Sequence, residues 1–483
     1  MDVTRHRLHI GGKWVEPSTG EFVRDLDPAT NQPIAEIASG GAEDAKAAVE
    51  AARAAFDHPD WRGMDPSKRG RLLYQLGQAV RDTFDEIARL ESLDVGKPIR
   101  EAKGDAAFVY KTLEYWAGMA DKVQGETIPV PGNRLNYTLR QPLGVTLHIA
   151  PWNYPLTLAV RGIAPALAAG NTVVLKPAQL TPLTALKFAE LSERAGFPPG
   201  VVNVVTGPGS SVGKALAEHA DVDSITFTGS LDTGRQILQM AAKHVTPVTL
   251  ELGGKNPNIV FADADLDRAV KSVLFGAFQN AGQMCWAGSR LLVHESIHAD
   301  LVRKVAERAA KMKLGPGLKE DSQMGPVVSR EQEKGVLSYV HLGVEEGAKL
   351  LVGGRKSAEP ELAAGNFVTP AVFDEVAPDM RIAREEIFGP VLTASSFATV
   401  DDLIGAANAV EFGLAAGVWT KDLKTAHAVA ARLEAGMVEI NEFPVTFPQT
   451  PFVGWKHSGL GHEQGLDAAR FYSRIKNVTV NLE

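Results

Sequence analysis

The sequence predicts an α/β protein built on a parallel sheet, and two observations support this fold class. Helical patterns alternate with short β-branched runs, and the runs recur at intervals of roughly 23 to 30 residues, the size of a strand–helix repeat. The runs are GVTLHIAP (144–151), NTVVLKP (171–177), VVNVVTG (201–207) and SITFTGS (224–230), and the helical patterns cover 156–169, 182–195, 212–219 and 231–242. Repeated units of this kind imply a sheet covered on both faces, with ligands bound where the strands end.

Long helical patterns precede this sheet. Residues 45–56, 68–93 and 101–123 place apolar side chains three and four positions apart, with few helix breakers. A strand-like stretch, LHIGGKWV (8–15), comes before them, and a β excursion rich in proline and glycine follows at 124–143. We expect the helices to pack on the sheet and to carry no chemistry of their own.

A second α/β half begins near residue 254. Its expected strands and helices are RLLVHESI (290–297), FVTPAVF (367–373), GLAAGVWT (413–420), GMVEIN (436–441), and helices around 298–312 and 329–346. The last segment, FYSRIKNVTVNL (471–482), reads as an exposed terminal strand, which needs a pairing partner. Another subunit is one candidate partner, and the excursion at 124–143 is a candidate for the same interface.

Composition narrows the class of function. The chain has 50 Lys and Arg against 58 Asp and Glu, a net charge of −8, so we expect neither nucleic acid nor an anionic membrane as its main partner. No uninterrupted apolar run reaches ~18 residues, so no membrane span is expected. The start, MDVTRHRLHIGGKW, lacks the apolar core of a signal peptide, and with a single cysteine this predicts a cytoplasmic protein.

The single cysteine, Cys285, lies in FQNAGQMCWAGSR (278–290). A lone cysteine forms no internal disulfide and builds no metal cluster, and we expect no metal site. A buried thiol that acts as a small hydrophobe is the alternative. The surrounding glycines and polar residues instead predict a tight hydrogen-bonded loop, which can expose the sulfur in a cleft and aim backbone N–H groups at an oxyanion. We therefore interpret Cys285 as a catalytic nucleophile.

Two glycine clusters follow consecutive strands of the predicted sheet. Gly229 and Ser230 stand at a strand-to-helix step, where backbone N–H groups and the helix dipole suit a pyrophosphate. Gly209 and Gly213 follow the preceding strand, in a spacing that differs from the standard dinucleotide fingerprint. Turns alone explain either cluster, but the two together favour a nucleotide.

Two polar side chains have unusual settings. Glu251 lies near the end of an apolar strand with two glycines close behind it, and it either pairs with Lys255 at the surface or acts as a general base. Asn153 lies in PWNYP, whose prolines and aromatic residues should fix it rigidly. It either makes a turn or offers its side-chain amide to an oxyanion.

Seven motifs in order make the chain resemble the NAD(P)-dependent aldehyde dehydrogenase superfamily over essentially its full length. They are PWNYP (151–155), KPAQ (176–179), FTGS (227–230), LELGGKNP (250–257), F-x-x-x-G-Q-x-C (278–285), EEIFGPV (385–391) and P-F-x-G-x-K-x-S-G-x-G-x-E (451–463). The resemblance implies a Rossmann-type parallel-sheet cofactor domain, an α/β catalytic domain and a small β oligomerisation arm, hence a homodimer or homotetramer. The implied boundaries are 1–121 and 142–253 for the cofactor domain, 254–457 for the catalytic domain, and 122–141 and 472–483 for the arm.

The resemblance also implies residue roles. Cys285 would attack the aldehyde, Asn153 with the Cys285 backbone N–H would form the oxyanion hole, and Glu251 would activate the deacylating water. Glu463 is similar to a tail glutamate that supports proton relay in some members. Cofactor contacts would come from Ile149, Trp152, Lys176, Gln179, Gly209, Gly213, Gly229, Ser230, Glu386 and Phe388. The tunnel for the aldehyde would be lined by Tyr154, Leu158, Arg161, Met284, Trp286, Phe443 and Phe447.

The implied reaction oxidises an aldehyde to a carboxylic acid through a thiohemiacetal and a thioester, with a hydride passing to the nicotinamide. The mostly apolar tunnel favours a medium-length aliphatic or an aromatic aldehyde. Arg161 and Glu442 are candidates for binding a charged substrate, although we favour a salt bridge or an indirect contact, through another residue, for both. A CoA-acylating enzyme is the first alternative, which Glu251 in its motif argues against. A non-catalytic protein on the same scaffold is the second, and the joint presence of Cys285, Glu251 and Asn153 makes it improbable.

Three positions depart from the superfamily pattern. Gln179 replaces the usual glutamate that ends K-P-x-E, which bears on the choice between NAD and NADP. We predict NAD-linked activity with measurable use of NADP. Val453 and His462 stand where glycine and arginine are common, and they imply only a slight reshaping around Glu463.

Overall fold

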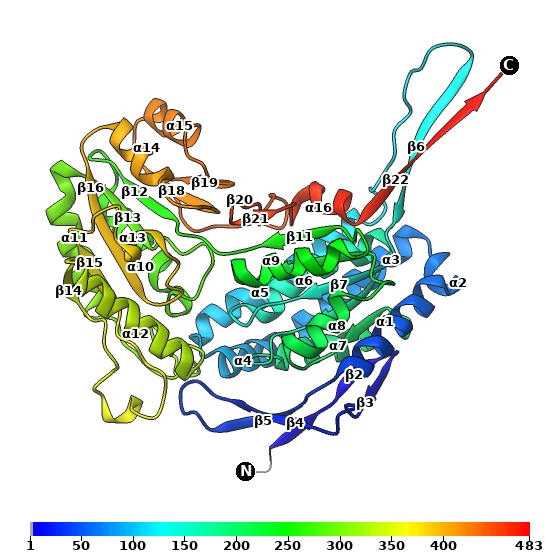
Figure 1. Ribbon diagram of the computed structural model, residues 1–483, viewed down its shortest axis with the longest axis horizontal. Helices are drawn as coiled ribbons and strands as arrows, with labels where there is room; N and C mark the ends of the chain where they lie inside the picture. The colour runs from blue at the N-terminus through cyan, green and yellow to red at the C-terminus, as the bar shows by residue number, and fades with distance from the viewer. Residues whose placement is uncertain (1–2) are drawn as a thin grey trace.

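The computed structural model describes residues 3–483 and contains two large sheets (Figure 1). The first has eight strands in the order β21-β11-β10-β7-β8-β9-β2-β3. They are β2 (Leu8–Ile10), β3 (Lys13–Val15), β7 (Val145–Ile149), β8 (Thr172–Lys176), β9 (Val202–Val204), β10 (Ser224–Thr228), β11 (Val248–Glu251) and β21 (Gly459–Leu460). The five strands from β11 to β9 are parallel to their neighbours, whereas β2, β3 and β21 pair antiparallel.

The four strands predicted from the β-branched runs are confirmed as a parallel block. Their residues are buried on both faces, which explains why the runs show no alternation of apolar and polar residues. Ile149 is in register with Lys176 on one side and with Phe227 on the other. The carboxyl ends of three adjacent strands therefore meet at one edge of the sheet.

Helices from the first half of the chain pack around this sheet. They are α1 (Ala42–Asp57), α2 (Pro59–Arg62), α3 (Pro66–Asp82), α4 (Phe84–Val95), α5 (Ile99–Met119), α6 (Pro155–Ala169), α7 (Leu183–Arg194), α8 (Lys214–Ala217) and α9 (Leu231–Ala242). The helical pattern at 68–93 is interrupted at Thr83, where α3 ends and α4 begins. Thr83 has φ −108° and its hydroxyl donates to the Ala79 carbonyl at 2.8 Å, a local bond that competes with helix continuation.

The second large sheet has seven strands in the order β14-β15-β16-β13-β12-β18-β19, and all neighbours except β14 and β15 are parallel. The strands are β12 (Pro257–Val260), β13 (Arg290–His294), β14 (Lys349–Val352), β15 (Ala371–Asp374), β16 (Val391–Phe397), β18 (Ala415–Trp419) and β19 (Met437–Ile440). The helices of this half are α10 (Leu266–Phe278), α11 (Glu295–Ala309), α12 (Arg330–Glu345), α13 (Arg381–Arg384), α14 (Val400–Asn408), α15 (Leu423–Ala430) and α16 (Gly465–Phe471).

Two predicted strands of this half are shorter than expected. The run at 290–297 leaves the sheet at His294, whose ring accepts the Ser296 N–H at 3.3 Å and caps α11. Within 367–373, only the last residues from Ala371 pair as a strand. Smaller sheets join β1 (Thr4–His6), β5 (Pro33–Ala38) and β4 (Phe22–Leu26), and also β17 (Phe412–Gly413) and β20 (Trp455–Lys456).

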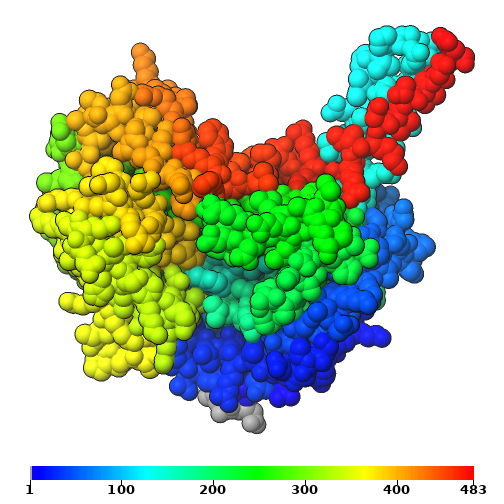
Figure 2. Space-filling view, viewed as in Figure 1, coloured from blue at the N-terminus to red at the C-terminus, as the bar shows by residue number. Residues whose placement is uncertain are grey.

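A two-stranded arm projects from the body of the molecule (Figures 1 and 2). It pairs β6 (Arg134–Pro142) antiparallel with β22 (Ser473–Asn481), so the predicted β excursion and terminal strand are partners within one chain. Pairing with another subunit and the domain boundaries stay predictions. No helix within residues 3–483 combines the length and apolar character that a membrane crossing needs.

Candidate active site

Cys285 follows a turn of unusual backbone geometry. Helix α10 ends at Phe278, and Asn280 and Ala281 then adopt left-handed φ angles of 49° and 53°. For residues other than glycine such angles cost about 1–3 kcal/mol each and persist only where the surroundings fix them. Gly282 continues the turn at φ 72° and lies against the Gly389 backbone. The tight loop predicted around the thiol is confirmed.

Hydrogen bonds lock this loop to the PWNYP segment. The Asn153 amide donates to the Gln283 carbonyl at 3.0 Å, and the Asn280 amide donates to the Asn153 carbonyl at 2.9 Å. Glu101 accepts the Asn280 backbone N–H at 2.8 Å, and the Gln283 side chain accepts the Val328 N–H at 2.9 Å. Asn153 is therefore rigid, as predicted, and its rigidity comes from these bonds as well as from its neighbouring prolines.

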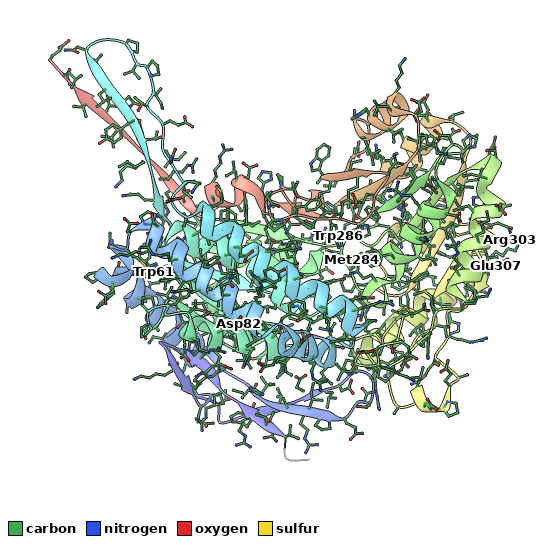
Figure 3. All side chains as sticks on the ribbon, turned by 180° about the vertical axis from the view of Figure 1, so that it is seen from behind. Trp61, Asp82, Met284, Trp286, Arg303 and Glu307 are labelled. Carbon is green, nitrogen blue, oxygen red and sulfur yellow. The ribbon has the colours of Figure 1, made fainter. Side chains whose placement is uncertain are left out.

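A cavity of about 450 Å³ opens beside Cys285. Five of the seven residues predicted for the aldehyde tunnel line it: Tyr154, Leu158, Arg161, Met284 and Trp286. Figure 3 shows Met284 and Trp286 near the middle of the molecule, between its two large sheets. Three further aromatic walls, Phe108, Phe275 and Phe452, were not predicted. Phe108 and Phe275 lie on α5 and α10 without a local motif, whereas Phe452 lies in the tail motif 451–463, to which no tunnel role was assigned.

Phe443 and Phe447 do not line this cavity, which corrects the sequence prediction. Phe443 is 3% exposed, and its ring packs so closely on Gly288 that a Cβ there would lie 2.8 Å away. Phe447 is 51% exposed and is absent from the cavity lining. The intervening Pro444, Val445 and Thr446 form the wall instead.

A buried charge cluster lies beside the thiol. Arg161 donates through Nε to the Glu463 carboxylate, and both side chains are almost fully buried. The guanidinium also lies 4.2 Å from the centre of the Phe452 ring. The salt bridge favoured for Arg161 is thus confirmed, although the side chain still reaches the cavity. Glu442 is exposed and makes no ion pair within the described residues.

Glu251 is buried next to this ion pair. It ends β11, is 1% exposed, and neither carboxylate oxygen has a hydrogen-bond partner within residues 3–483. Burial raises the pKa of Glu251 well above its usual range, the Glu463 charge raises it further, and Arg161 lowers it. The alternative of a surface salt bridge to Lys255 is wrong, since Lys255 is itself buried with an unpartnered amine.

The surroundings of the thiol disfavour its thiolate form. Burial raises the pKa of Cys285 to about 12, Arg161 opposes this, and the Glu386 and Glu251 charges raise it further. Because the thiolate is the nucleophile, the proton has to leave as the sulfur attacks or shortly before. Arg161 lowers the pKa values of both Cys285 and Glu251.

Predicted cofactor residues gather where the strands of the first sheet end. Ile149 and Lys176 close β7 and β8, while Gly229 and Ser230 follow β10. The Ser230 hydroxyl accepts the Thr233 N–H at 3.3 Å and so caps the twelve-residue helix α9. Backbone N–H groups in the first turn of such a helix suit a phosphate.

Lys176 has spare hydrogen-bonding capacity at this edge. Its side chain is 5% exposed, and burial lowers the pKa of Lys176 to about 8. Among the described residues, its amine bonds only to the adjacent Pro177 carbonyl, at 2.9 Å. Gly213 lies against its aliphatic stem, and Gly209 borders open space. Gln179 is half-buried three residues further on, with no side-chain hydrogen bond within the described chain.

Groups from the second half of the chain face the same edge. Glu386 accepts the Gly254 N–H at 3.1 Å, and burial raises the pKa of Glu386 to about 7. The rings of Trp152 and Phe388 meet edge to face at 5.2 Å. This region thus brings together the Lys176 amine, the Glu386 carboxyl, the amino terminus of α9 and the rings of Trp152 and Phe388. Together these groups fit the riboses, the pyrophosphate and the rings of a dinucleotide.

Comparison with known proteins decides the family. The model of the aldehyde dehydrogenase family matches residues 14–478. The chain belongs to this family. Betaine aldehyde dehydrogenase of Bacillus subtilis is 45% identical, over 98% of this chain and 97% of the relative, and hydroxyisobutyraldehyde dehydrogenase of Mycolicibacterium austroafricanum is 46% identical, over 99% and 94%. The family and enzyme class predicted from the seven motifs are confirmed.

Solved aldehyde dehydrogenase structures share this fold. The betaine aldehyde dehydrogenase of Staphylococcus aureus in complex with NAD⁺ superposes with a TM-score of 0.97 at 40% identity, covering 99% of this chain and 94% of that one. An NAD⁺ complex of aldehyde dehydrogenase from Bacillus cereus gives 0.97 at 42% identity, covering 99% and 97%. The predicted aldehyde dehydrogenase-like fold is confirmed.

Proposed function

We propose that this aldehyde dehydrogenase oxidises a medium-length aliphatic or aromatic aldehyde to the carboxylic acid, with NAD preferred and NADP also used. The observation that supports this substrate class is the position of Cys285 in a cavity with six aromatic or thioether walls, Phe108, Tyr154, Phe275, Met284, Trp286 and Phe452. Such walls bury an apolar chain while the aldehyde carbon reaches the sulfur.

Cys285 is proposed as the nucleophile and Asn153 as a donor to the oxyanion. The Asn153 side-chain nitrogen carries two hydrogens, and the Gln283 carbonyl occupies one of them. The second is left for the negative oxygen that forms when the thiolate attacks, together with the Cys285 backbone N–H. One such donor is worth about 3 kcal/mol in comparable sites.

Glu251 is proposed as the base that activates water for thioester hydrolysis. Its two unpartnered oxygens are free to accept a proton, and its raised pKa makes the ionised carboxylate a strong acceptor. The buried ion pair between Arg161 and Glu463 lies beside Glu251, and its two charges act on the pKa of Glu251. We assign Glu463 to this electrostatic support and to proton relay.

Lys176 and Glu386 are proposed to bind the two riboses of NAD, with Gly229 and Ser230 at the pyrophosphate and Ile149, Trp152 and Phe388 along the groove. Gln179, Gly209 and Gly213 would border the adenosine end. Bound NAD supplies the acceptor for the hydride that leaves the aldehyde carbon. The residues of this chain bind it, orient it against Cys285 and exclude water.

The arm formed by β6 and β22 is proposed to pair with another copy of the chain, giving a homodimer or homotetramer in the cytoplasm. It projects from the body and exposes Leu135, Leu139, Ile475 and Val480, and a lone two-stranded ribbon is marginal in water. We retain the boundaries 122–141 and 472–483 for this arm, with 1–121 and 142–253 for the cofactor domain and 254–457 for the catalytic domain.

Absorbance of the reduced nicotinamide tests this function. The panel includes aliphatic aldehydes of increasing length, benzaldehyde, betaine aldehyde and hydroxyisobutyraldehyde, each with NAD or NADP and with or without CoA. We expect the highest kcat/KM for apolar aldehydes without CoA. Strict dependence on CoA would indicate an acylating enzyme. No increase in absorbance with any aldehyde would indicate a non-catalytic scaffold.

A further inference from the structure

Glu101 connects two distant parts of the chain at the thiol loop. It lies in the first turn of α5, is 9% exposed, and accepts the backbone N–H of Asn280 at 2.8 Å across 179 positions of sequence. The side chain also forms part of the wall of the cavity that contains Cys285. The bond therefore joins the amino-terminal helices to the loop of the second α/β half.

The residue that donates this bond, Asn280, is the first of the left-handed pair, Asn280 and Ala281. Its carbonyl accepts the Gln283 N–H at 3.1 Å and the Gln283 side chain at 2.9 Å, and its amide donates to Asn153. Those partners belong to the thiol loop itself or to PWNYP. Within residues 3–483, Glu101 supplies the one hydrogen bond to Asn280 that comes from outside both segments, and it ties the pair to helix α5.

We propose that Glu101 is a positioning residue, which fixes the left-handed turn and thereby places the Cys285 sulfur and the Asn153 amide relative to each other. Without its oxygen, the Asn280 N–H is buried without a partner and the turn relaxes toward ordinary φ angles. The sulfur and the oxyanion donor then lose their common geometry. The effect on turnover rests on the function proposed above, whereas the effect on thiol reactivity does not.

The proposal requires an acceptor oxygen at this position and no particular charge. Burial raises the pKa of Glu101 to about 7, opposed by the Asn280 hydrogen bond and by Lys97 and Arg100 and reinforced by Asp105. A protonated carboxyl keeps its carbonyl oxygen as an acceptor, so the bond to Asn280 survives either state. Glutamine offers the same acceptor at the same reach without the charge.

Three variants separate the acceptor from the charge. We expect Glu101→Gln to retain kcat, whereas Glu101→Met loses about tenfold to a hundredfold, a size typical of an ångström-scale misplacement. Glu101→Asp, whose shorter side chain withdraws the oxygen, is expected to lose activity like the methionine variant. The KM for NAD should change little in all three.

The single thiol provides a readout that needs no turnover. The rate of alkylation by iodoacetamide, followed by mass spectrometry of the intact protein, reports Cys285 alone. We expect the methionine and aspartate variants to depart from the wild-type rate and the glutamine variant to match it. Glu114→Met is the matched control, because Glu114 lies on the same helix and accepts one side-chain bond, from Gln78 at 3.2 Å.

Two results would overturn the proposal. Wild-type alkylation and kcat in Glu101→Met, or in Glu101→Asp where the methionine variant does not fold, would show that the bond does not position the thiol. An equal loss in Glu101→Gln and Glu101→Met would show that the charge matters and the acceptor does not. If every variant lacks turnover because the proposed reaction is wrong, the order of the alkylation rates still tests whether Glu101 positions the thiol.

Discussion

Two buried clusters near the cavity have the same charges and different bonding. In one, the Lys97 amine bonds two carboxylates, Glu91 at 3.2 Å and Asp105 at 2.7 Å. In the other, Arg161 bonds Glu463 alone, and Glu251 is left beside the pair without a partner. Each cluster thus contains one cation and two acids, but only the second keeps a free carboxylate.

The difference separates a structural cluster from a reactive one. Burial raises the pKa of Glu91 to about 7 and also raises that of Asp105, while the Lys97 charge and its hydrogen bonds lower both values. Burial likewise raises the pKa of Glu251, but no hydrogen bond within residues 3–483 occupies its oxygens, so they are open to a proton from water. The Lys97 amine also lies 3.8 Å from the centre of the Tyr154 ring. Because Tyr154 lines the cavity, the cluster at Lys97 instead supports the cavity wall.

The largest expected effect removes the proposed nucleophile, which lies beside the second cluster. Cys285→Ala should abolish aldehyde oxidation, because the chain has no other thiol. Binding of NAD, measured by calorimetry, and thermal unfolding should match the wild type, since the alanine leaves every charged group in place. Turnover of the alanine variant near the wild-type rate would refute the covalent mechanism.

Glu251→Gln tests the free carboxylate directly. We expect one burst of reduced cofactor and then a stalled acyl-enzyme, because glutamine cannot deprotonate the water. Rapid mixing, with mass spectrometry of the intact protein, shows the added acyl mass. Loss of the burst itself would assign Glu251 to thiol activation as well, and normal steady-state turnover would exclude it from the reaction.

Lys97→Met tests the bonded cluster, and we expect a loss of stability. Removing the cation leaves Glu91 and Asp105 buried without their partner, which costs roughly 3–5 kcal/mol. Urea unfolding followed by circular dichroism measures the loss. The pH dependence of acyl-enzyme hydrolysis should stay as in the wild type, and a shifted profile would contradict the structural assignment of this cluster.

Arg161→Met sharpens the comparison through pH. Arg161 lowers the pKa of Glu251, so its removal raises that pKa further. A general base works only when ionised, so the rising limb of acyl-enzyme hydrolysis against pH should move to higher pH. Arg161→Lys keeps a cation and should shift the limb less. If the rising limb is unchanged in both variants, Arg161 does not set the pKa of Glu251.

A residue of this site could be predicted from the sequence where it lies in a local motif, and could not where its contacts form only after folding. Cys285 and Glu251 lie in local motifs, and the parallel strands are marked by β-branched runs, so both could be predicted. The walls Phe108 and Phe452 lie on a helix and a tail that meet only after folding. The Glu101 bond spans 179 positions, and nothing near Glu101 or Asn280 marks it in the sequence.

Phe443 shows the converse error. The family resemblance implied that Phe443 is a tunnel wall, but three glycines, Gly276, Gly288 and Gly417, leave room for its ring in the protein interior. Thr83 likewise breaks a helical pattern through one local hydroxyl bond. The periodicity of the sequence indicates which residues are apolar. Which of these residues face a cavity depends on how closely the backbone segments pack in the folded chain.

The smallest expected effect concerns a position outside both clusters. Gln179 is half-buried three residues beyond Lys176, is uncharged, and makes no side-chain hydrogen bond within residues 3–483. A carboxylate here would accept hydrogen bonds from the adenosine-ribose hydroxyls and would repel a 2′-phosphate by like charge. Glutamine keeps the accepting oxygen and lacks the repulsion, and the Lys176 amine has capacity left to pair with a phosphate.

We therefore expect Gln179→Glu to sharpen the preference for NAD over NADP. Repulsion in a half-buried groove amounts to roughly 1 kcal/mol or more, which is about fivefold or more in selectivity. The measurement is the ratio of kcat/KM for the two cofactors before and after the change, with Gln179→Met as a control that removes the acceptor without adding charge. If the ratio is unchanged in the glutamate variant, Gln179 does not contact the 2′ position, and the cofactor preference has to come from the surroundings of Lys176 alone.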